Sequence, residues 1–205
     1  MADMQSDAEQ AAKLDKPGAG IPFMHGLMLR WFVGPVVANM SDWNKSSGDF
    51  VAVNAKVLKA ARKLTDAEMS VRVLVPSQHG LEDSSRYWSA AMVLEHLVIV
   101  GTGMKKITIS LSQGIVPPIK ADTALVKPKG ALSPQEALKN FEDYAANTVN
   151  DIERDVKDRR SKAQLPHPWF GPFTAHQWHW LLTGHSVIHL GQLRAIVERL
   201  KPSVK

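Results

Sequence analysis

The chain has 205 residues, 44% of them hydrophobic and 22% charged, a balance typical of a folded globular protein rather than a disordered or fibrous one. Its length fits one domain with some additional segments, and its net charge of +5 permits an anionic partner without requiring one. Cysteine is absent, which excludes disulfide scaffolds, thiolate metal sites and thiol nucleophiles. Any metal ion would therefore be bound by histidine, aspartate or glutamate.

The first twenty residues are mostly polar and end in a glycine-rich stretch. They lack the basic start and apolar block of a secretory signal, so we expect a disordered or extended tail over residues 1–20 of a cytoplasmic protein. Residues 21–40 are the most apolar stretch, but Arg30 lies near its middle and Pro22 and Pro35 interrupt it. A membrane span needs about 20 nearly uncharged residues. This pattern favours a buried or dimer-facing helix, and hence a homodimer, over a membrane span.

Two helices are predicted in the first half of the remaining chain. Apolar residues step by threes and fours over residues 50–64, the pattern of one buried helical face. Residues 71–75 look extended, but five residues cannot form a sheet by themselves. A longer apolar stripe predicts a second helix over residues 83–112, closed by Gly114 and the prolines that follow.

The second half predicts two more helices, each beginning with a capping box. Ser133 and Glu136 begin the third, over residues 133–156, and Thr174 begins the fourth, over residues 174–200. Four amphipathic helices without a strand partner indicate an all-α fold, a four-helix bundle with an additional N-terminal helical segment.

The predicted bundle core spans about residues 47–200 within a single helical domain, residues 21–205. Its connections at residues 65–82 and 114–132 are long for a bundle. Loops of that length are uncommon and often serve a binding site or a partner.

Three histidines lie on stripes that should face the interior. His185 and His189 are four residues apart and share the apolar face of the fourth helix, while His96 lies on the apolar stripe of the second. Each buried imidazole has two nitrogens that need partners, and one divalent metal ion satisfies a nitrogen from each ring. Three nitrogen ligands plus water make an open, catalytic type of zinc site. The alternative is three core histidines, each bonded to a backbone carbonyl or a carboxylate, and the spacing alone leaves both interpretations open.

Two separated segments resemble one known superfamily. Residues 167–178 (HPWFGPFTAHQW), followed by His185-x-x-x-His189-x-x-Gln192, are similar to the C-terminal half of DinB-like (DinB/YfiT) proteins, in a form with the pattern HPxFGxxT. Residues 88–97 (WSAAMVLEHL) resemble the second helix of the same superfamily. The resemblance covers residues 50–200 approximately and does not extend to the first 45.

This resemblance implies a four-helix bundle, often dimeric, that holds a divalent ion, nickel or zinc, through one histidine of the second helix and two of the fourth. Carried over to this chain, those ligands are His96, His185 and His189. The same three histidines lie on the apolar stripes of the two predicted helices.

Other residues are candidates for the surroundings of this site. Gln192 lies one turn beyond His189 and can orient a ligand, or simply lie at the edge of the bundle interface. Glu95 is about 100° around the helix from His96 and is expected to face another helix or solvent. His176 and His179 are off the stripe and are expected to make surface or loop contacts. The full set of second-sphere or pocket candidates is Trp88, Met92, Glu95, His167, Trp169 and Gln192.

The leading functional hypothesis is a metal-dependent enzyme in which the ion activates water or a thiol for hydrolysis or transfer. The thiol follows from the resemblance, because relatives include transferases and an isomerase that use low-molecular-weight thiols. The alternative is a non-catalytic metal-binding or stress-response module acting through dimerisation. Nucleic-acid binding is disfavoured, because the basic residues at 157–162 come without a recognition motif. The substrate is expected to be a small molecule, and no side chain stands out as nucleophile or general base.

Overall fold

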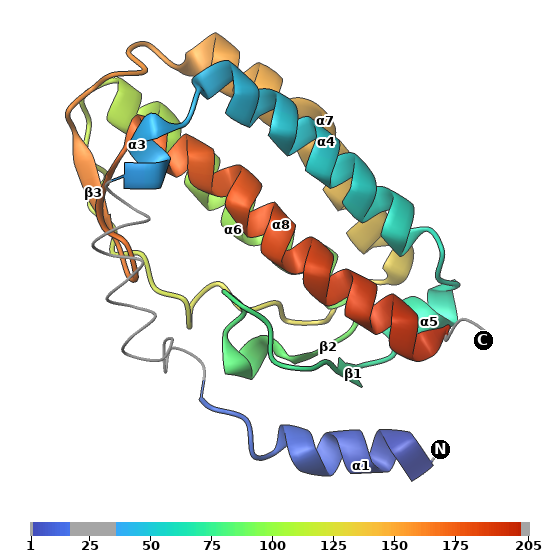
Figure 1. The fold of residues 1–205 in the computed structure, drawn as a ribbon. Helices are drawn as coiled ribbons and strands as arrows, with labels where there is room; N and C mark the ends of the chain where they lie inside the picture. Colours follow the sequence, from blue (N-terminus) through green and yellow to red (C-terminus); the bar gives the residue numbers. More distant parts are fainter. Residues whose placement is uncertain (1, 17–35, 202–205) are drawn as a thin grey trace.

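The computed structural model describes residues 2–16 and 36–201, and its centre is a four-helix bundle (Figure 1). The bundle helices are α4 (Trp43–Ala61), α6 (Ala90–Ser112), α7 (Pro134–Asp155) and α8 (Ala175–Leu200). Helix α8 packs against α4 and α6, and α7 packs against the same two helices on the other side. Helices α4 and α8 run in one direction and α6 and α7 in the other (Figure 1). The predicted all-α bundle is confirmed.

The ends of the bundle helices follow local capping chemistry. Ser133 and Glu136 form the predicted capping box of α7, and the backbone N–H of Thr174 donates to the Gln177 side chain at the start of α8. Helix α6 begins seven residues later than predicted, because the Ser89 hydroxyl accepts the backbone N–H of Met92 and so caps the helix there. Local side-chain hydrogen bonds therefore set these boundaries.

The segment before α6 is not helical as a whole. It contains a short 3-10 turn, Asp83–Ser85, and strand β2, Tyr87–Trp88, which pairs antiparallel with β1, Val73–Leu74. The prediction of a helix from residue 83 was therefore wrong, because backbone pairing with a distant segment outweighs a local apolar stripe. The segment predicted to be extended near residues 71–75 contains β1, and β2 is the strand with which it pairs.

A second hairpin, which no pattern predicted, leads into α8. Strands β3, Gln164–His167, and β4, Gly171–Thr174, pair antiparallel, and Gly171 adopts a φ of 77°, which favours glycine. This hairpin carries His167 and Phe173 toward the bundle interior.

The N-terminal residues 2–11 form helix α1 (Ala2–Ala11) rather than the predicted disordered or extended tail. The Asp7 carboxylate accepts the backbone N–H of Leu74 and pairs with Arg199. These partners are 67 and 192 residues away in sequence, so a local reading of a polar segment could not reveal them. Short α5 (Asp66–Ser70) follows α4.

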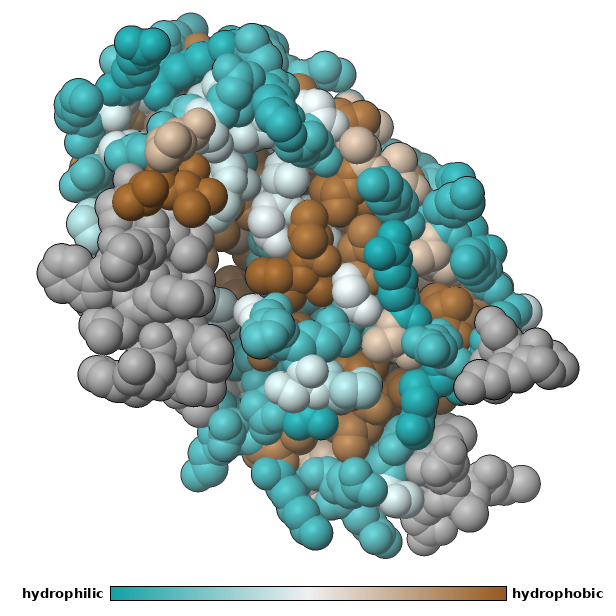
Figure 2. Space-filling model, viewed as in Figure 1, coloured by the Kyte–Doolittle hydropathy of each residue, from teal (hydrophilic) through white to brown (hydrophobic). Residues whose placement is uncertain are grey.

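The apolar segment predicted as a helix over residues 21–40 lies mostly outside the described residues. Its end forms the short helix α3 (Ala38–Met40). Within residues 2–16 and 36–201, no helix is both long and apolar enough to cross a bilayer. In the view of Figure 2, hydrophilic side chains dominate the rim of the bundle, and hydrophobic ones reach the surface mainly near its centre.

Candidate metal centre

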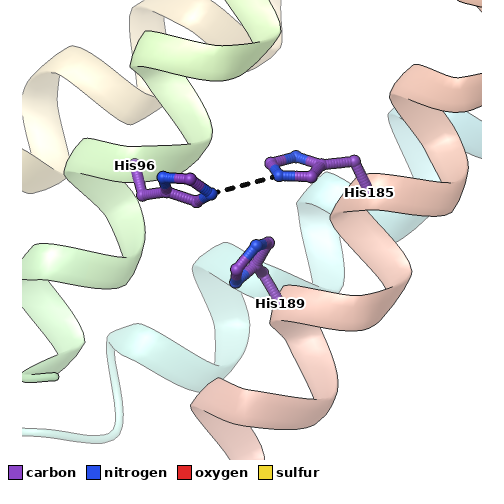
Figure 3. A group of neighbouring side chains, drawn as sticks. All are labelled: His96, His185 and His189. Carbon is purple, nitrogen blue, oxygen red and sulfur yellow. Dashed lines mark hydrogen bonds between the residues drawn. The ribbon is translucent and has the colours of Figure 1, made fainter. Parts of the chain in front are cut away.

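Three imidazole rings converge between α6 and α8 (Figure 3). His96 projects from α6, and His185 and His189 project from successive turns of α8. One ring nitrogen of each lies within 4.8 Å of the others, and the Nε2 atoms of His96 and His185 are 3.2 Å apart. Among the described residues, no other group of three or more histidine, aspartate or glutamate side chains is arranged to hold a metal ion. The sequence predicted this convergence.

Hydrogen bonds fix the orientation of two of these rings. The Nδ1–H of His96 donates to the backbone carbonyl of Val126 at 2.9 Å. Because a carbonyl only accepts, this bond assigns the proton to Nδ1 and leaves the Nε2 lone pair of His96 directed at the cluster.

Gln192 fixes the orientation and the tautomer of the His189 ring in the same way. Its Nε2 donates to the carbonyl of Ser85 at 2.7 Å, which leaves its Oε1 to accept the Nδ1–H of His189, also at 2.7 Å. His189 therefore also keeps a free Nε2 lone pair. Metal-binding histidines in proteins are held in this way by a carbonyl or carboxylate behind the ring.

The three rings are neutral near pH 7. Burial lowers the pKa of His189 to about 4 and is also the main reason why the pKa values of His96 and His185 lie well below their usual range. His189 and the Lys127 ammonium also lower the pKa of His96. Neutral imidazole is the form that binds a metal ion, so the cluster is poised to act as a ligand set.

The donor chemistry fits a borderline transition metal. Three imidazole nitrogens suit zinc, nickel, copper or iron, whereas calcium and magnesium prefer oxygen ligands. A set of three protein ligands leaves a coordination position open, the arrangement of catalytic rather than structural zinc sites. The cluster is therefore consistent with a metal site.

A cavity of about 160 Å³ adjoins the rings. Its wall is mostly apolar. The lining residues are Gly80, Leu81, Glu82, Ser85, His96, Val100, Met104, Thr123, Val126, Lys127, His167, Trp169, Phe170, Leu181, His185, Ile188 and His189. A metal ion held by the three rings would therefore face a space that admits a small molecule.

Several predicted pocket residues lie at this cavity or against the histidine rings. His167 and Trp169 line it, and the Trp88 ring stacks nearly parallel to His189, with 6.0 Å between the centroids. Burial lowers the pKa of His167 to about 3, so it is neutral as well.

Met92 and Glu95 were predicted at the pocket but do not line this cavity. The Glu95 carboxylate points instead at the connection before α7, where it accepts the backbone N–H groups of Lys129 and Gly130. Met92 lies beside Gly130. The one-residue offset from His96 turns Glu95 away from the cluster, as helical geometry requires.

His179 also differs from its predicted surface position. It is 2% exposed, and its ring stacks on Trp43 with 4.0 Å between centroids. His176 is partly buried and contacts Ser41. Both belong to the packing of α8 against α4 and the segment before it, away from the cluster.

A buried ion pair at the cavity wall was missed by the sequence analysis. Lys127 pairs with Glu82 and donates to the hydroxyl groups of Ser84 and Ser85 at 2.9 and 2.8 Å. Thr123 donates to the other oxygen of Glu82. These residues lie in the two long connections, where no periodicity marks them; the length of those connections was the only available signal.

Comparisons with known proteins agree with this architecture. The sequence profile of the DinB superfamily matches residues 49–193. TT2238, described as a four-helix bundle protein, aligns with a TM-score of 0.54 and 21% identity over 75% of this chain and 98% of its own.

YfiT from Bacillus subtilis aligns with a TM-score of 0.55 and 18% identity over 91% of this chain and 94% of its own. It is described as a probable metal-dependent hydrolase with an unusual four-helix bundle topology. No curated protein matches the sequence significantly. At these identities the two solved structures bear on the fold alone, whereas the profile match covers most of the chain: this protein belongs to the DinB superfamily.

Proposed function

We propose that the protein is a metal-dependent hydrolase in which His96, His185 and His189 hold one divalent transition ion, zinc or nickel. The observation that supports this proposal most directly is that hydrogen bonds to Nδ1 fix the rings of His96 and His189 and leave their Nε2 lone pairs free. One nitrogen of each of the three rings lies within 4.8 Å of the others in the wall of a cavity. Membership of the DinB superfamily and the likeness to YfiT support it.

The reaction class is the hydrolysis of an ester or amide. The oxygen of water bonds to the carbonyl carbon, the bond to the leaving oxygen or nitrogen breaks, and the leaving atom takes up a proton. An ion at this position would supply Lewis acidity and a water of lowered pKa. The protein supplies the ligands, their orientation through Val126 and Gln192, and an apolar cavity that limits water.

Lys127 and Glu82 add an ion pair to that wall. The Lys127 ammonium donates to Glu82, Ser84 and Ser85, which uses its three N–H donors within the protein. The pair therefore helps to hold the cavity wall in place and leaves the chemistry to the histidine cluster.

Elemental analysis of protein purified without metal-affinity resin tests the site. We expect about one zinc or nickel ion per chain. His189→Ala should lose that ion while keeping its helical circular dichroism. His176→Ala, which changes another histidine of α8 outside the cluster, should retain the ion. Absence of a bound transition ion, or equal retention in both variants, would overturn the assignment.

Activity assays then separate the reaction classes. Metal-loaded protein should cleave members of a panel of activated esters and amides, and chelator-treated protein should not. Turnover of electrophiles only with an added low-molecular-weight thiol would instead support thiol transfer. A bound ion without turnover on either panel would favour a non-catalytic metal-binding module.

A further inference from the structure

A second cavity lies directly beside the one that contains the histidines. It measures about 200 Å³ and opens toward solvent between α6 and the connection that precedes α7. Residues common to the walls of both cavities are Val100, Met104, Thr123, Val126 and His167. The two spaces therefore meet at a short row of side chains, among which Met104 is unbranched and able to change rotamer at small cost.

The wall of the second cavity is apolar. Its hydrophobic residues are Ile99, Val100, Met104, Ile107, Ile119, Ala121, Leu125, Val126, Pro168 and Trp178. Its charged residues, Lys120 and Asp122, are both exposed and lie toward solvent. In the first cavity, the charges of Glu82 and Lys127 already neutralise each other. Neither cavity therefore presents a buried, unpaired charge to the hydrocarbon part of a ligand.

Large apolar side chains are exposed around this second cavity. Ile99, Ile119 and Leu125 are 37%, 54% and 80% exposed, and all three belong to its wall. Single exposed hydrophobic residues are ordinary, but a group of them around one hollow is typical of a site that receives apolar ligands.

From this placement we infer that the substrate is an amphiphile with an ester or amide head at the histidines and an unbranched, uncharged acyl chain. The chain passes Met104 and occupies the second cavity. This inference rests on the proposed function for the chemistry of the head, whereas the chain site stands on the two cavities alone.

Binding of a chain-length series tests the inference. The probes are butano-, hexano- and octanohydroxamic acid, titrated by calorimetry against zinc-loaded protein, because the hydroxamate head binds zinc and the chain alone varies. Each added methylene should lower Kd about fourfold while it remains buried. A Kd that does not change with chain length would overturn the inference.

A variant that fills the second cavity sharpens the test. Gly103 is part of its wall, and a Cβ atom there meets nothing within 4 Å apart from its chain neighbours and the adjacent backbone of α6. Gly103→Leu should weaken octanohydroxamate by about 16-fold, the equivalent of two methylenes, and leave butanohydroxamate within about twofold. Gly103→Ala is the matched control and should keep the wild-type series. Equal effects of Gly103→Leu on all chain lengths would contradict the assignment; if this variant does not fold, the wild-type series decides.

A second arm separates this inference from the proposed function. The alkanols butan-1-ol, hexan-1-ol and octan-1-ol carry no strong zinc ligand and are titrated against metal-free protein. A steep dependence on chain length there supports the chain site even if no metal binds. Metal binding with no chain-length dependence in either series leaves the proposed function intact and overturns the chain site.

Discussion

At the scale of single residues, the cluster depends on groups behind the imidazoles as much as on the imidazoles themselves. Gln192 is fully buried and bridges His189 to the carbonyl of Ser85. A buried amide that uses both ends in this way fixes the ring rotation and the tautomer of His189 together. Metal affinity should therefore respond to Gln192 although it does not reach the ion.

Gln192→Met keeps the approximate size of the side chain and removes both hydrogen bonds. We expect metal affinity to fall about 10- to 100-fold, because His189 loses the partner that holds its Nδ1 proton. Competition with a chromophoric chelator measures the dissociation constant. The exposed Gln135→Met serves as control and should bind metal as the wild type does. An unchanged affinity in Gln192→Met would show that the bridge has no role in binding.

At the scale of elements, α6 presents two glycines with opposite surroundings. Gly101 faces α7, where a Cβ atom would lie 1.9 Å from the Tyr144 hydroxyl oxygen. Gly103 is two residues further along the same helix and would meet nothing within 4 Å. The close approach of α6 and α7 thus depends on the missing side chain at Gly101, and Gly103 has no such role in packing.

Alanine substitutions at Gly101 and Gly103 should change the free energy of unfolding in opposite directions. Gly101→Ala should lower the free energy of unfolding by about 1–3 kcal/mol, because Tyr144 must move in a packed interface. Gly103→Ala should raise it by up to about 1 kcal/mol, because alanine has the higher helix propensity. Urea denaturation followed by circular dichroism measures both. If both variants were stabilised, the packing of α6 against α7 would differ from the one described.

The connection before α7 is the element that links the cluster to the rest of the chain. It supplies the Val126 carbonyl to His96 and Lys127 to Glu82, and the Glu95 carboxylate of α6 accepts two of its backbone N–H groups. Each contact is modest by itself, about 0.5–1.5 kcal/mol for the neutral hydrogen bond and about 1.5–3 kcal/mol for those to charged groups. Together they position one wall of the cavity against α6.

At the scale of the whole molecule, buried histidines couple folding to pH. Burial lowers the pKa values of His167, His179 and His189 to about 3, 4 and 4 in the folded protein. In the unfolded chain they return to about 6.5. Between pH 6.5 and 4 the unfolded state therefore binds more protons, and the stability present above pH 6.5 is lost as the pH falls through this window.

The free energy of unfolding of metal-free protein should decrease from pH 7 to pH 4.5. The slope per histidine can reach about 1.4 kcal/mol per pH unit within the window. Urea titrations at several pH values measure it. His179→Gln lies outside the cluster and should give a shallower dependence than the wild type. A stability that is constant or rises toward pH 4.5 would contradict neutral burial of these rings.

The sequence by itself determined the parts of this protein that are encoded locally. Apolar spacing and the capping box at Ser133 predicted the bundle helices, and the i, i+4 pair His185 and His189 on an apolar face predicted the cluster with His96. These patterns are informative because a helix converts spacing along the chain directly into position on a face. The role of the rings as metal ligands stays a prediction.

Only the tertiary structure decided what depends on distant partners. The docking of α1 through Asp7 and the Glu82–Lys127 pair beside the histidines both join segments that are far apart in sequence. The orientation of the Glu95 side chain toward Lys129 and Gly130 likewise depends on the position of the connection before α7. Loop residues have no periodicity, so their side chains acquire a position only when the bundle brings the connections together.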